Sequence, residues 1–262
     1  MILSRRVALG GIELDELDES IVIRSSDPGV PHESTGAENR AGGFGSRLTM
    51  QHWDSLDASV TFAINIPKQE MTRRREVFDA VIAWANDLGW LTSNMMEGRR
   101  LWVGKVVVPG SGDLWNWLAE YTITFRVFGE PFWRDIEPTD VVKKTISKGT
   151  VQIQVGGTAP GVLDLAFENA SGKQINDVTF TVNGKNLILK GVNLAADETL
   201  RLTHTAEGLV RLRAVKADNS YRNVYALLRG ADDSYVTPGT MDVTLDASRA
   251  GNLTVRNYAR WL

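Results

Sequence analysis

The sequence lacks cysteine in all of its 262 residues. Disulfide bonds, thiolate metal sites and a catalytic Cys–His pair are therefore excluded, and the absence fits synthesis in a reducing compartment. Histidine is scarce as well. Its three copies, His32, His52 and His204, share no metal-ligand spacing, and the sequence contains no HExxH. We therefore expect no metal and no cofactor.

Long hydrophobic runs are also missing. No segment approaches the roughly 18 consecutive apolar residues that a membrane-spanning helix needs, so we expect no span. The N-terminal stretch MILSRRVALGGIELDE has basic residues but no continuous apolar core, which argues against a secretory signal. The composition is otherwise ordinary for a globular protein, with 43% hydrophobic and 23% charged residues.

Charge and tryptophan are distributed unevenly along the chain. Residues 1–135 contain 14 Lys and Arg against 19 Asp and Glu, whereas residues 136–262 contain 15 against 13. Seven of the eight tryptophans lie in the first part. The segment 135–149 is polar and carries Pro138, as a linker does. We therefore predict two domains, 1–135 and 136–262; the alternative is one domain with a long loop.

The first domain is predicted to combine strands with one helix. Apolar residues recur at intervals of three and four along 68–89, which predicts a helix that is capped at Gly89. The segment 27–46 is rich in glycine, proline and small polar residues and is predicted to be a long loop. Alternating or apolar runs predict strands at 20–25, 56–66, 99–108 and 115–129.

The second domain is predicted to contain strands only. Asn183–Gly184 is a strong signal for a tight hairpin, because both central residues of that turn need a positive φ. Short strands with turn signals between them are typical of a β-sandwich. The strands are expected at 150–155, 163–169, 177–182, 186–191, 199–204, 209–215, 241–246 and 253–262.

An acidic cluster lies near the N-terminus and contains Glu13, Asp15, Glu16, Asp18 and Glu19. Carboxylates can bind a hard cation, but the cluster lacks the ligand order and glycine turn of a calcium loop. We favour a solvated or interface patch. The glycine-rich GGFGS at 42–46 lacks the Lys-Ser/Thr pair of a phosphate-binding loop, which favours a flexible loop.

Two further groups are candidate assembly contacts. Arg73, Arg74 and Arg75 lie in the first half of the predicted helix, where the helix dipole disfavours cations. They either contact an acidic neighbour in an assembly or form a solvated face. Phe132 and Trp133 follow the stop formed by Gly129 and Pro131. They either bind a second subunit or act as a staple within the chain, and full burial of each contributes about 1.5–3 kcal/mol.

Three tyrosines, Tyr221, Tyr225 and Tyr235, lie in the loop-rich stretch 216–239. Exposed aromatic rings can stack on sugars, although filling the core is the commoner role. Paired carboxylates for sugar hydrolysis stay open as an alternative, but 32 acidic residues make chance pairs easy.

The order of several segments resembles the phage distal tail protein family, the siphophage-type proteins at the hub of the tail tip. The opening LGGIELDELDESIVIRS is followed by a glycine-rich loop and by SVTFAINI. The helix RREVFDAVIAWANDLGWL and the strands RRLWVGKVVV and AEYTITFRVFGEPFWRD come next. A β-rich half with VNGKNLILKG then ends in RNYARWL. The resemblance covers nearly the whole chain.

The resemblance implies a mostly-β protein with one α-helix and no enzymatic activity. Its N-terminal, β-sandwich-like domain would close into a homohexameric ring around a channel for DNA. Its C-terminal half would be a galectin-like or carbohydrate-binding-module-like sandwich of jelly-roll type. The implied partners are the tail tube protein, a tail-tip hub or tail-associated protein, and receptor-binding proteins. The implied location is the virion tail, after synthesis in the host cytoplasm.

The charge asymmetry fits this picture, because a cationic channel would bind DNA phosphates strongly. We expect a neutral or acidic channel with part of the Glu13–Glu19 cluster near it. Two other functions stay open: an adhesion module that binds host glycans, and a glycoside hydrolase.

Overall fold

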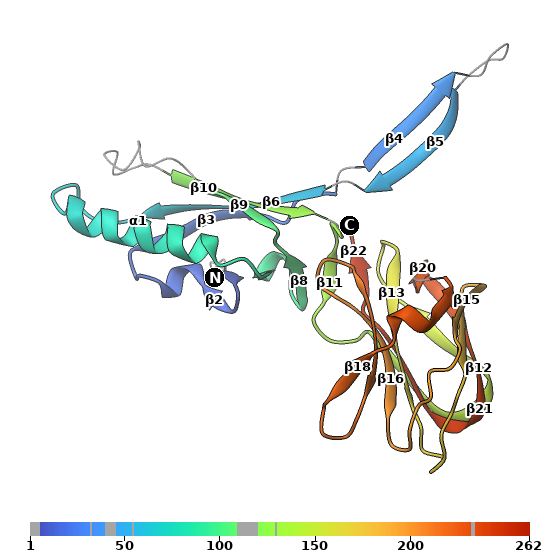
Figure 1. Ribbon diagram of the computed structural model, residues 1–262. Coiled ribbons are helices and arrows are strands. Elements are labelled where there is room, and N and C mark those ends of the chain that lie inside the picture. Colours follow the sequence, from blue (N-terminus) through green and yellow to red (C-terminus); the bar gives the residue numbers. More distant parts are fainter. Residues whose placement is uncertain are drawn as a thin grey trace. The chain divides into compact units, whose positions relative to one another are not determined.

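The computed structural model describes residues 6–31, 33–39, 46–53, 55–108, 120–128, 130–231 and 234–262. Contacts divide the chain into two compact units, Met1–Trp133 with Leu262, and Arg134–Trp261. The domain limits expected from the sequence lie two residues further along the chain. The described residues are mostly β, with a single α-helix (Figure 1), which confirms the predicted fold class.

The first unit is built on an antiparallel sheet of four strands in the order β3-β6-β10-β9. Their bounds are Ile21–Asp27 for β3, Ser55–Ile64 for β6, Glu120–Phe128 for β10 and Lys105–Val107 for β9. Strand β6 alternates between buried and half-buried positions, and β10 pairs with it over nine residues. The period of two therefore places one apolar row of β6, from Leu56 to Phe62, in the core.

Helix α1, Met71–Asn86, packs on this sheet through aromatic contacts (Figure 1). The rings of Phe78 and Tyr121 lie 5.2 Å apart, and those of Trp84 and Phe125 lie 6.0 Å apart. The helix ends at Asn86 and Asp87 is its C-cap, so the predicted cap at Gly89 is wrong. Gly89 lies beside Gly10, and a Cβ at position 89 would be in ordinary van der Waals contact with the backbone of Gly10, at 3.6 Å.

The remaining short strands of the first unit lie in the order β2-β1-β7-β8. They are β1 (Val7–Leu9), β2 (Ile12–Glu13), β7 (Trp90–Ser93) and β8 (Arg99–Trp102), with 3₁₀ turns η1 (Leu14–Glu16) and η2 (Asn94–Met96). The loop expected at 27–46 contains a strand, so that prediction is wrong. β4, Glu33–Asn39, pairs with β5, Ser46–Trp53. Of the glycine-rich stretch 42–46, residues 42–45 lie outside the described residues.

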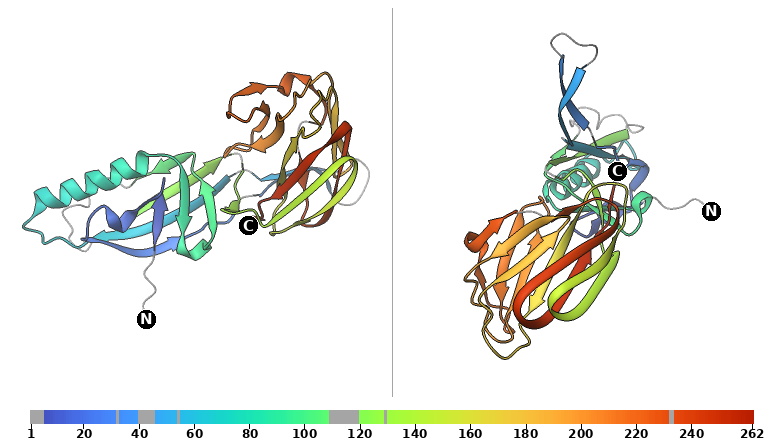
Figure 2. Two further views of the ribbon diagram at one scale, coloured as in Figure 1. Left: turned by 90° about the horizontal axis from the view of Figure 1, so that it is seen from below. Right: turned by 90° about the vertical axis from the view of Figure 1, so that its right-hand side faces the viewer.

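The second unit is organised by two long strands, β12 (Asp140–Val155) and β21 (Gly239–Asn257), which pair along their lengths with one irregularity between Ile146 and Lys148. The C-terminal half of β21 pairs with β13, and its N-terminal half pairs with β14. The two strands thus belong to both layers of the sandwich (Figure 2).

The other strands extend from β21 in two series. One series runs β13 (Gly161–Glu168), β16 (Thr199–His204), β17 (Val210–Val215) and β18 (Tyr221–Asn223). The other runs β14 (Val178–Val182), β15 (Lys185–Leu189) and β19 (Leu228–Gly230). Shorter elements are η4 (Tyr225–Leu227), β20 (Tyr235–Val236), β22 (Arg260–Trp261) and β11 (Trp133–Asp135). A single core of aliphatic and phenylalanine side chains fills the space between the layers.

The linker expected at 135–149 is mostly strand, because β12 begins at Asp140. Its polar side chains misled the prediction, since this part of β12 faces water while its backbone pairs with β21. The predicted hairpin at Asn183–Gly184 is confirmed: these residues have φ of 51° and 73° and join β14 to β15.

Candidate functional site

Phe132 and Trp133 are buried within the first unit. The indole N–H of Trp133 donates to the carbonyl oxygen of Pro28 at 2.9 Å, and only 1% of the residue is exposed. Phe132 meets the ring of Trp53 edge to face, with the ring centroids 5.7 Å apart. These contacts are those of an intrachain staple. A contact with a second subunit stays a prediction.

The three arginines of α1 have three different environments. Arg75 binds both carboxylate oxygens of Asp79, one turn along the helix, at 2.9 and 3.0 Å. Arg73 lies 3.6 Å from Asp18. Arg74 is fully buried, so a solvated face is wrong for this residue. The sequence carried a signal for that burial, because position 74 continues the helical spacing of the buried Val77 and Phe78.

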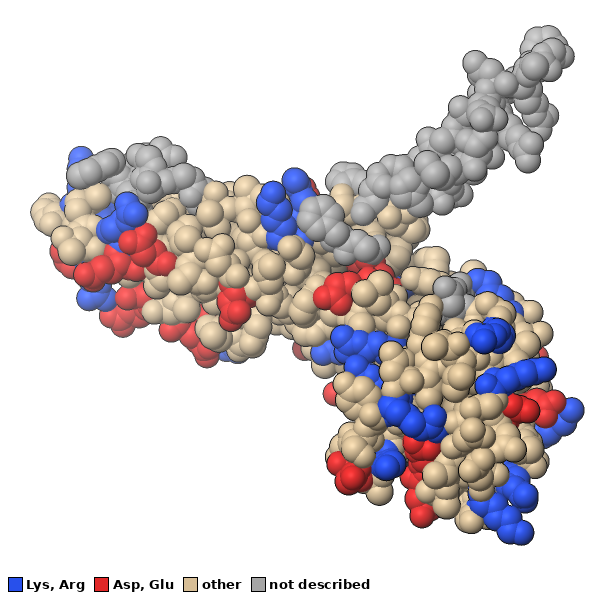
Figure 3. Space-filling model, viewed as in Figure 1, with Lys and Arg blue, Asp and Glu red and all other residues tan. Residues whose placement is uncertain are grey.

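The acidic cluster lies on and beside η1, and acidic side chains are visible on the first unit in Figure 3. Glu13 and Glu16 form a reciprocal capping box. Glu13 also lies 3.5 Å from Arg6, and Asp18 accepts a hydrogen bond from the amide of Ser20. Within the described ranges no group of three or more Asp, Glu or His is arranged to hold a metal ion. The cluster is thus partly neutralised by its own surroundings, and its place in a channel stays a prediction.

The tyrosines expected as sugar contacts are all exposed, so none of them fills the core. Tyr221 on β18 has the guanidinium of Arg213 4.0 Å from its ring centroid. Tyr225 lies close by in sequence, on η4. Tyr235 lies on β20, which pairs with β13 and is separate from β18 in the sheet. Only the first two tyrosines are therefore brought into one neighbourhood.

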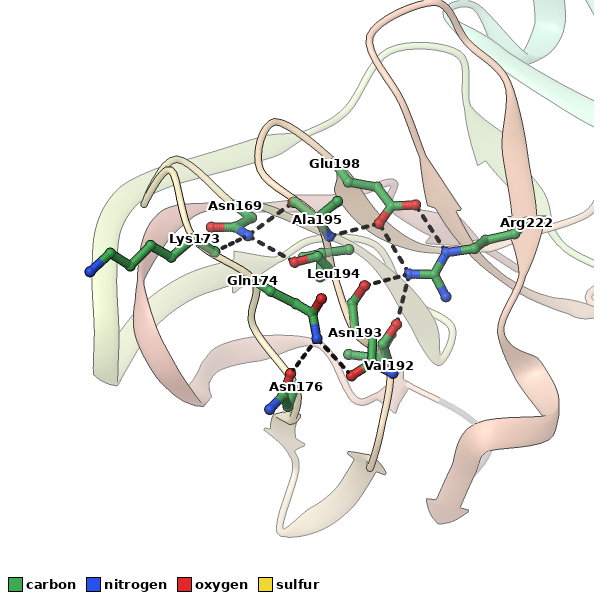
Figure 4. A network of polar contacts seen from close by, with 10 residues as sticks. All are labelled: Asn169, Lys173, Gln174, Asn176, Val192, Asn193, Leu194, Ala195, Glu198 and Arg222. Atoms are coloured by element: carbon green, nitrogen blue, oxygen red, sulfur yellow. Dashed lines mark hydrogen bonds and ion pairs between the residues drawn. The ribbon is translucent and has the colours of Figure 1, made fainter.

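An ion pair between the buried Glu198 and the partly exposed Arg222 links the loop before β16 to β18 (Figure 4), and the sequence analysis did not identify it. Arg222 donates to both carboxylate oxygens of Glu198 at 3.0 Å, and its Nη2 also donates to the carbonyl of Val192 at 2.7 Å. Glu198 is 2% exposed and accepts a further bond from the amide of Ala195. The two charged residues are 24 positions apart in the sequence, so no local sequence pattern predicts the pair.

Asn169 forms the other centre of this polar network (Figure 4). The residue is fully buried, and its amide nitrogen lies 2.8–2.9 Å from the carbonyl oxygens of Lys173, Leu194 and Ala195. These bonds join the turn after β13 to the loop that carries Glu198. The network therefore fixes the loops at this end of the sandwich, and β18 with them.

The Glu198 pair makes the second unit sensitive to acid. Burial acts to raise the pKa of Glu198, but the bonds from Arg222 and Ala195 outweigh it and hold the pKa below its ordinary value. The stabilisation is therefore fully present above the ordinary carboxyl pKa and is lost as pH falls through the lower, folded-state value. We expect the difference in unfolding free energy between the native chain and Glu198→Gln to shrink from pH 6 to pH 3. Urea titrations of both proteins measure it, and a constant difference would contradict the expectation.

Asp164, His204 and Ser234 also come together in the second unit. His204 Nδ1 lies 3.4 Å from a carboxylate oxygen of Asp164, and its Nε2 lies 3.5 Å from the hydroxyl of Ser234. Both distances are long, the imidazole is fully buried, and the hydroxyl donates instead to the carbonyl of Leu163 at 2.8 Å. With its proton committed to a carbonyl, Ser234 is not activated as a nucleophile. The group is a buried polar network.

No helix among the described residues is long and apolar enough to cross a membrane.

The chain is similar to known proteins in its fold. No protein-family model matches the sequence, and no curated protein matches it. Among solved structures, the Dit protein (gp 19.1) of SPP1 matches with a TM-score of 0.68 at 11% identity, over 98% of this chain and 99% of that one. Its description calls it a paradigm of the hub adsorption apparatus in phages that infect Gram-positive bacteria. A chain of the phage p2 baseplate in its activated conformation is a weaker match, with a TM-score of 0.47 and 10% identity over 96% of this chain and 98% of that one.

Proposed function

We propose, from the fold that this chain shares with SPP1 Dit, that the protein is a structural hub of a phage tail tip. It joins the tail tube to the distal tip or baseplate and is located in the virion tail. The observation that carries the proposal is the extent of the likeness, which covers 98% of the chain and therefore both compact units. A shared sandwich alone would say little, because such folds serve many functions.

The first unit is the part that we propose to assemble into a six-membered ring. It carries seven of the eight tryptophans and charged groups of both signs at its surface, such as Arg73 and the acids around η1. Aromatic residues and arginine are enriched at protein interfaces. The ring would contact the tail tube protein on one side and a tail-tip hub or tail-associated protein on the other.

DNA would pass through the ring without specific binding. The first 135 residues have five more acidic than basic residues, and a net negative lining repels phosphate instead of holding it. We propose that part of the Glu13–Glu19 cluster lies near this channel. A structure of the assembled ring with a strongly basic lumen would refute the placement.

The assembly is tested with the purified chain. We expect negative-stain electron microscopy to show rings with a central hole, and mass photometry to show a species of six times 28.9 kDa. A chain that stays monomeric at high concentration, and that antibodies never locate at a tail tip, would refute the hub role. The role is structural, so release of sugars from cell-wall polysaccharide by the pure protein would also contradict it.

The second unit is the proposed docking site for receptor-binding proteins. It is an independent compact unit with its own core, as a module carried on the outside of a ring requires. A pull-down of tail-tip proteins with the full chain as bait would identify the partner. Substitutions at the surface of the second unit should then abolish the binding.

A further inference from the structure

Three arginines gather on the outer face of β16 and β17. Arg201 lies directly opposite Arg213 in the antiparallel register, and Arg211 lies opposite Thr203, one row further along. The intervening residues of both strands, among them Leu202 and Leu212, are buried in the core. Because side chains alternate along a strand, all three guanidinium groups project from the same outer face.

This arrangement costs folding stability. Like charges directly opposite each other on neighbouring strands repel. Among the residues that the structure describes, no carboxylate lies within ion-pair distance of Arg201, Arg211 or Arg213. Sequences that break a local rule of stability often do so at functional sites. An anion bound by Arg211 and Arg213 would offset part of this repulsion.

A hollow of about 340 Å³ is lined by two of these arginines, Arg211 and Arg213. Its volume falls within the range of sites for small ligands. The hollow combines two cations with an amide and an aromatic ring, a set that can bind an acidic group, a hydroxyl and the face of a sugar. Its lining consists of Val210, Arg211, Leu212, Arg213, Asn223 and Tyr225.

The polar groups of the hollow are held in place by their neighbours. Arg213 stacks on the ring of Tyr221, and the side-chain oxygen of Asn223 accepts a bond from the amide of Tyr225 at 2.9 Å, which leaves its N–H₂ group to donate. Strand β18 itself is tied down by the bonds of Arg222 to Glu198. A site whose side chains are already positioned loses less entropy when a ligand binds.

We propose that this hollow binds an acidic saccharide, a sugar residue that carries a carboxylate or a phosphate. Arg211 and Arg213 bind the acidic group, Asn223 donates to a ring hydroxyl, and the exposed ring of Tyr225 packs against the sugar. An acidic protein partner would need a broad interface, whereas this hollow has the size of one or two sugar residues. The inference is independent of ring assembly and goes beyond the hub role.

Isothermal titration calorimetry with the full chain tests the proposal. The probes are cellobiuronic acid and glucose 6-phosphate as the two acidic types, neutral cellobiose, and a triglutamate peptide. We expect one or both acidic sugars to bind with a Kd in the millimolar range or below, and cellobiose to bind at least about tenfold more weakly, since a charge-assisted bond is worth about a factor of ten or more. A comparison of the two acidic sugars shows whether the hollow prefers a carboxylate or a phosphate.

The variants locate the site. We expect Arg211→Gln with Arg213→Gln to weaken binding of the acidic sugar about tenfold or more. Arg249→Gln, which removes one positive charge at an exposed residue outside the hollow, should leave binding unchanged. Asn223→Asp keeps the oxygen that Tyr225 binds and adds a negative charge, so it should weaken acidic sugars even if the double variant does not fold. Absence of binding at about 10 mM, equal binding of neutral sugar, equal loss in Arg249→Gln, or stronger binding of triglutamate would overturn the proposal.

Discussion

Replacing Trp133 by alanine is expected to lower the free energy of unfolding of the first unit by about 3–5 kcal/mol, because truncating a buried aromatic side chain removes its apolar contacts and leaves a cavity. The side chain is 1% exposed. The substitution also leaves the carbonyl of Pro28 without the indole N–H that now binds it at 2.9 Å. Urea unfolding, followed by the fluorescence of the remaining tryptophans, measures the loss.

Trp133→Phe is the milder control, since it keeps one aromatic ring and removes the N–H donor together with part of the indole. We expect it to cost about 1–2 kcal/mol, the usual range for one hydrogen bond and a small change of volume. Light scattering of Phe132→Ala with Trp133→Ala then separates the two roles of this pair. Unchanged ring mass with lowered stability would leave only the staple; loss of the ring in a protein that is still folded would place the pair in the subunit interface.

Arg222→Ala is expected to destabilise the second unit by at most about 3–5 kcal/mol, the cost of leaving one partner of a fully buried ion pair uncompensated. The effect is asymmetric. Glu198 is almost completely buried, whereas the side chain of Arg222 is 41% exposed and can turn to water when its partner is removed. Glu198→Ala should therefore cost less than Arg222→Ala, and the double variant should be more stable than Arg222→Ala alone.

The pH dependence provides an independent test of the same pair. Without Arg222, burial is opposed only by the amide of Ala195 and the charge of Lys216, so the pKa of the Glu198 carboxyl group rises from its native value. A group with a raised carboxyl pKa destabilises the folded state most at neutral pH, where it must be charged. The stability deficit of Arg222→Ala should thus shrink as pH falls from 7 to 4. A deficit that is constant with pH, or equal costs for the two single variants, would show that the ion pair does not set the stability of these loops.

The sequence predicted the elements whose side chains follow a clear period. The helix and the strands 56–66 and 163–169 have one apolar face each and lie close to where they were expected. The hairpin at Asn183–Gly184 was identified because few residues tolerate a positive φ at both positions. Local patterns of this kind depend on neighbours in the sequence, so they can be recognised without the fold.

The errors have a common cause. The N-terminal part of β12 and the strand β4 are polar, and each is held by backbone pairing with a strand further along the chain. Backbone pairing cannot be recognised from amino-acid composition, so the sequence analysis predicted one segment as a linker and the other as a loop. The Glu198–Arg222 pair and the opposed Arg201 and Arg213 were missed for a related reason, since register places them together and register was unknown.

Arg74 is the one site residue that a stricter treatment of the sequence could have placed. Its position on the buried stripe of α1 was readable, but three consecutive arginines were treated as a single surface group. Consecutive residues of a helix point about 100° apart, so a charged triplet cannot share one environment.

Strands β12 and β21 both cross from one layer of the second unit to the other, and this crossing has a mechanical consequence. Each layer contains a segment of both strands, with β12 as its edge strand and β21 next to it, so the layers cannot come apart while this ladder is intact. The amides of β12 and β21 should therefore exchange with deuterium together, in one slow event, and the module should resist a pulling force as a single body until it gives way all at once.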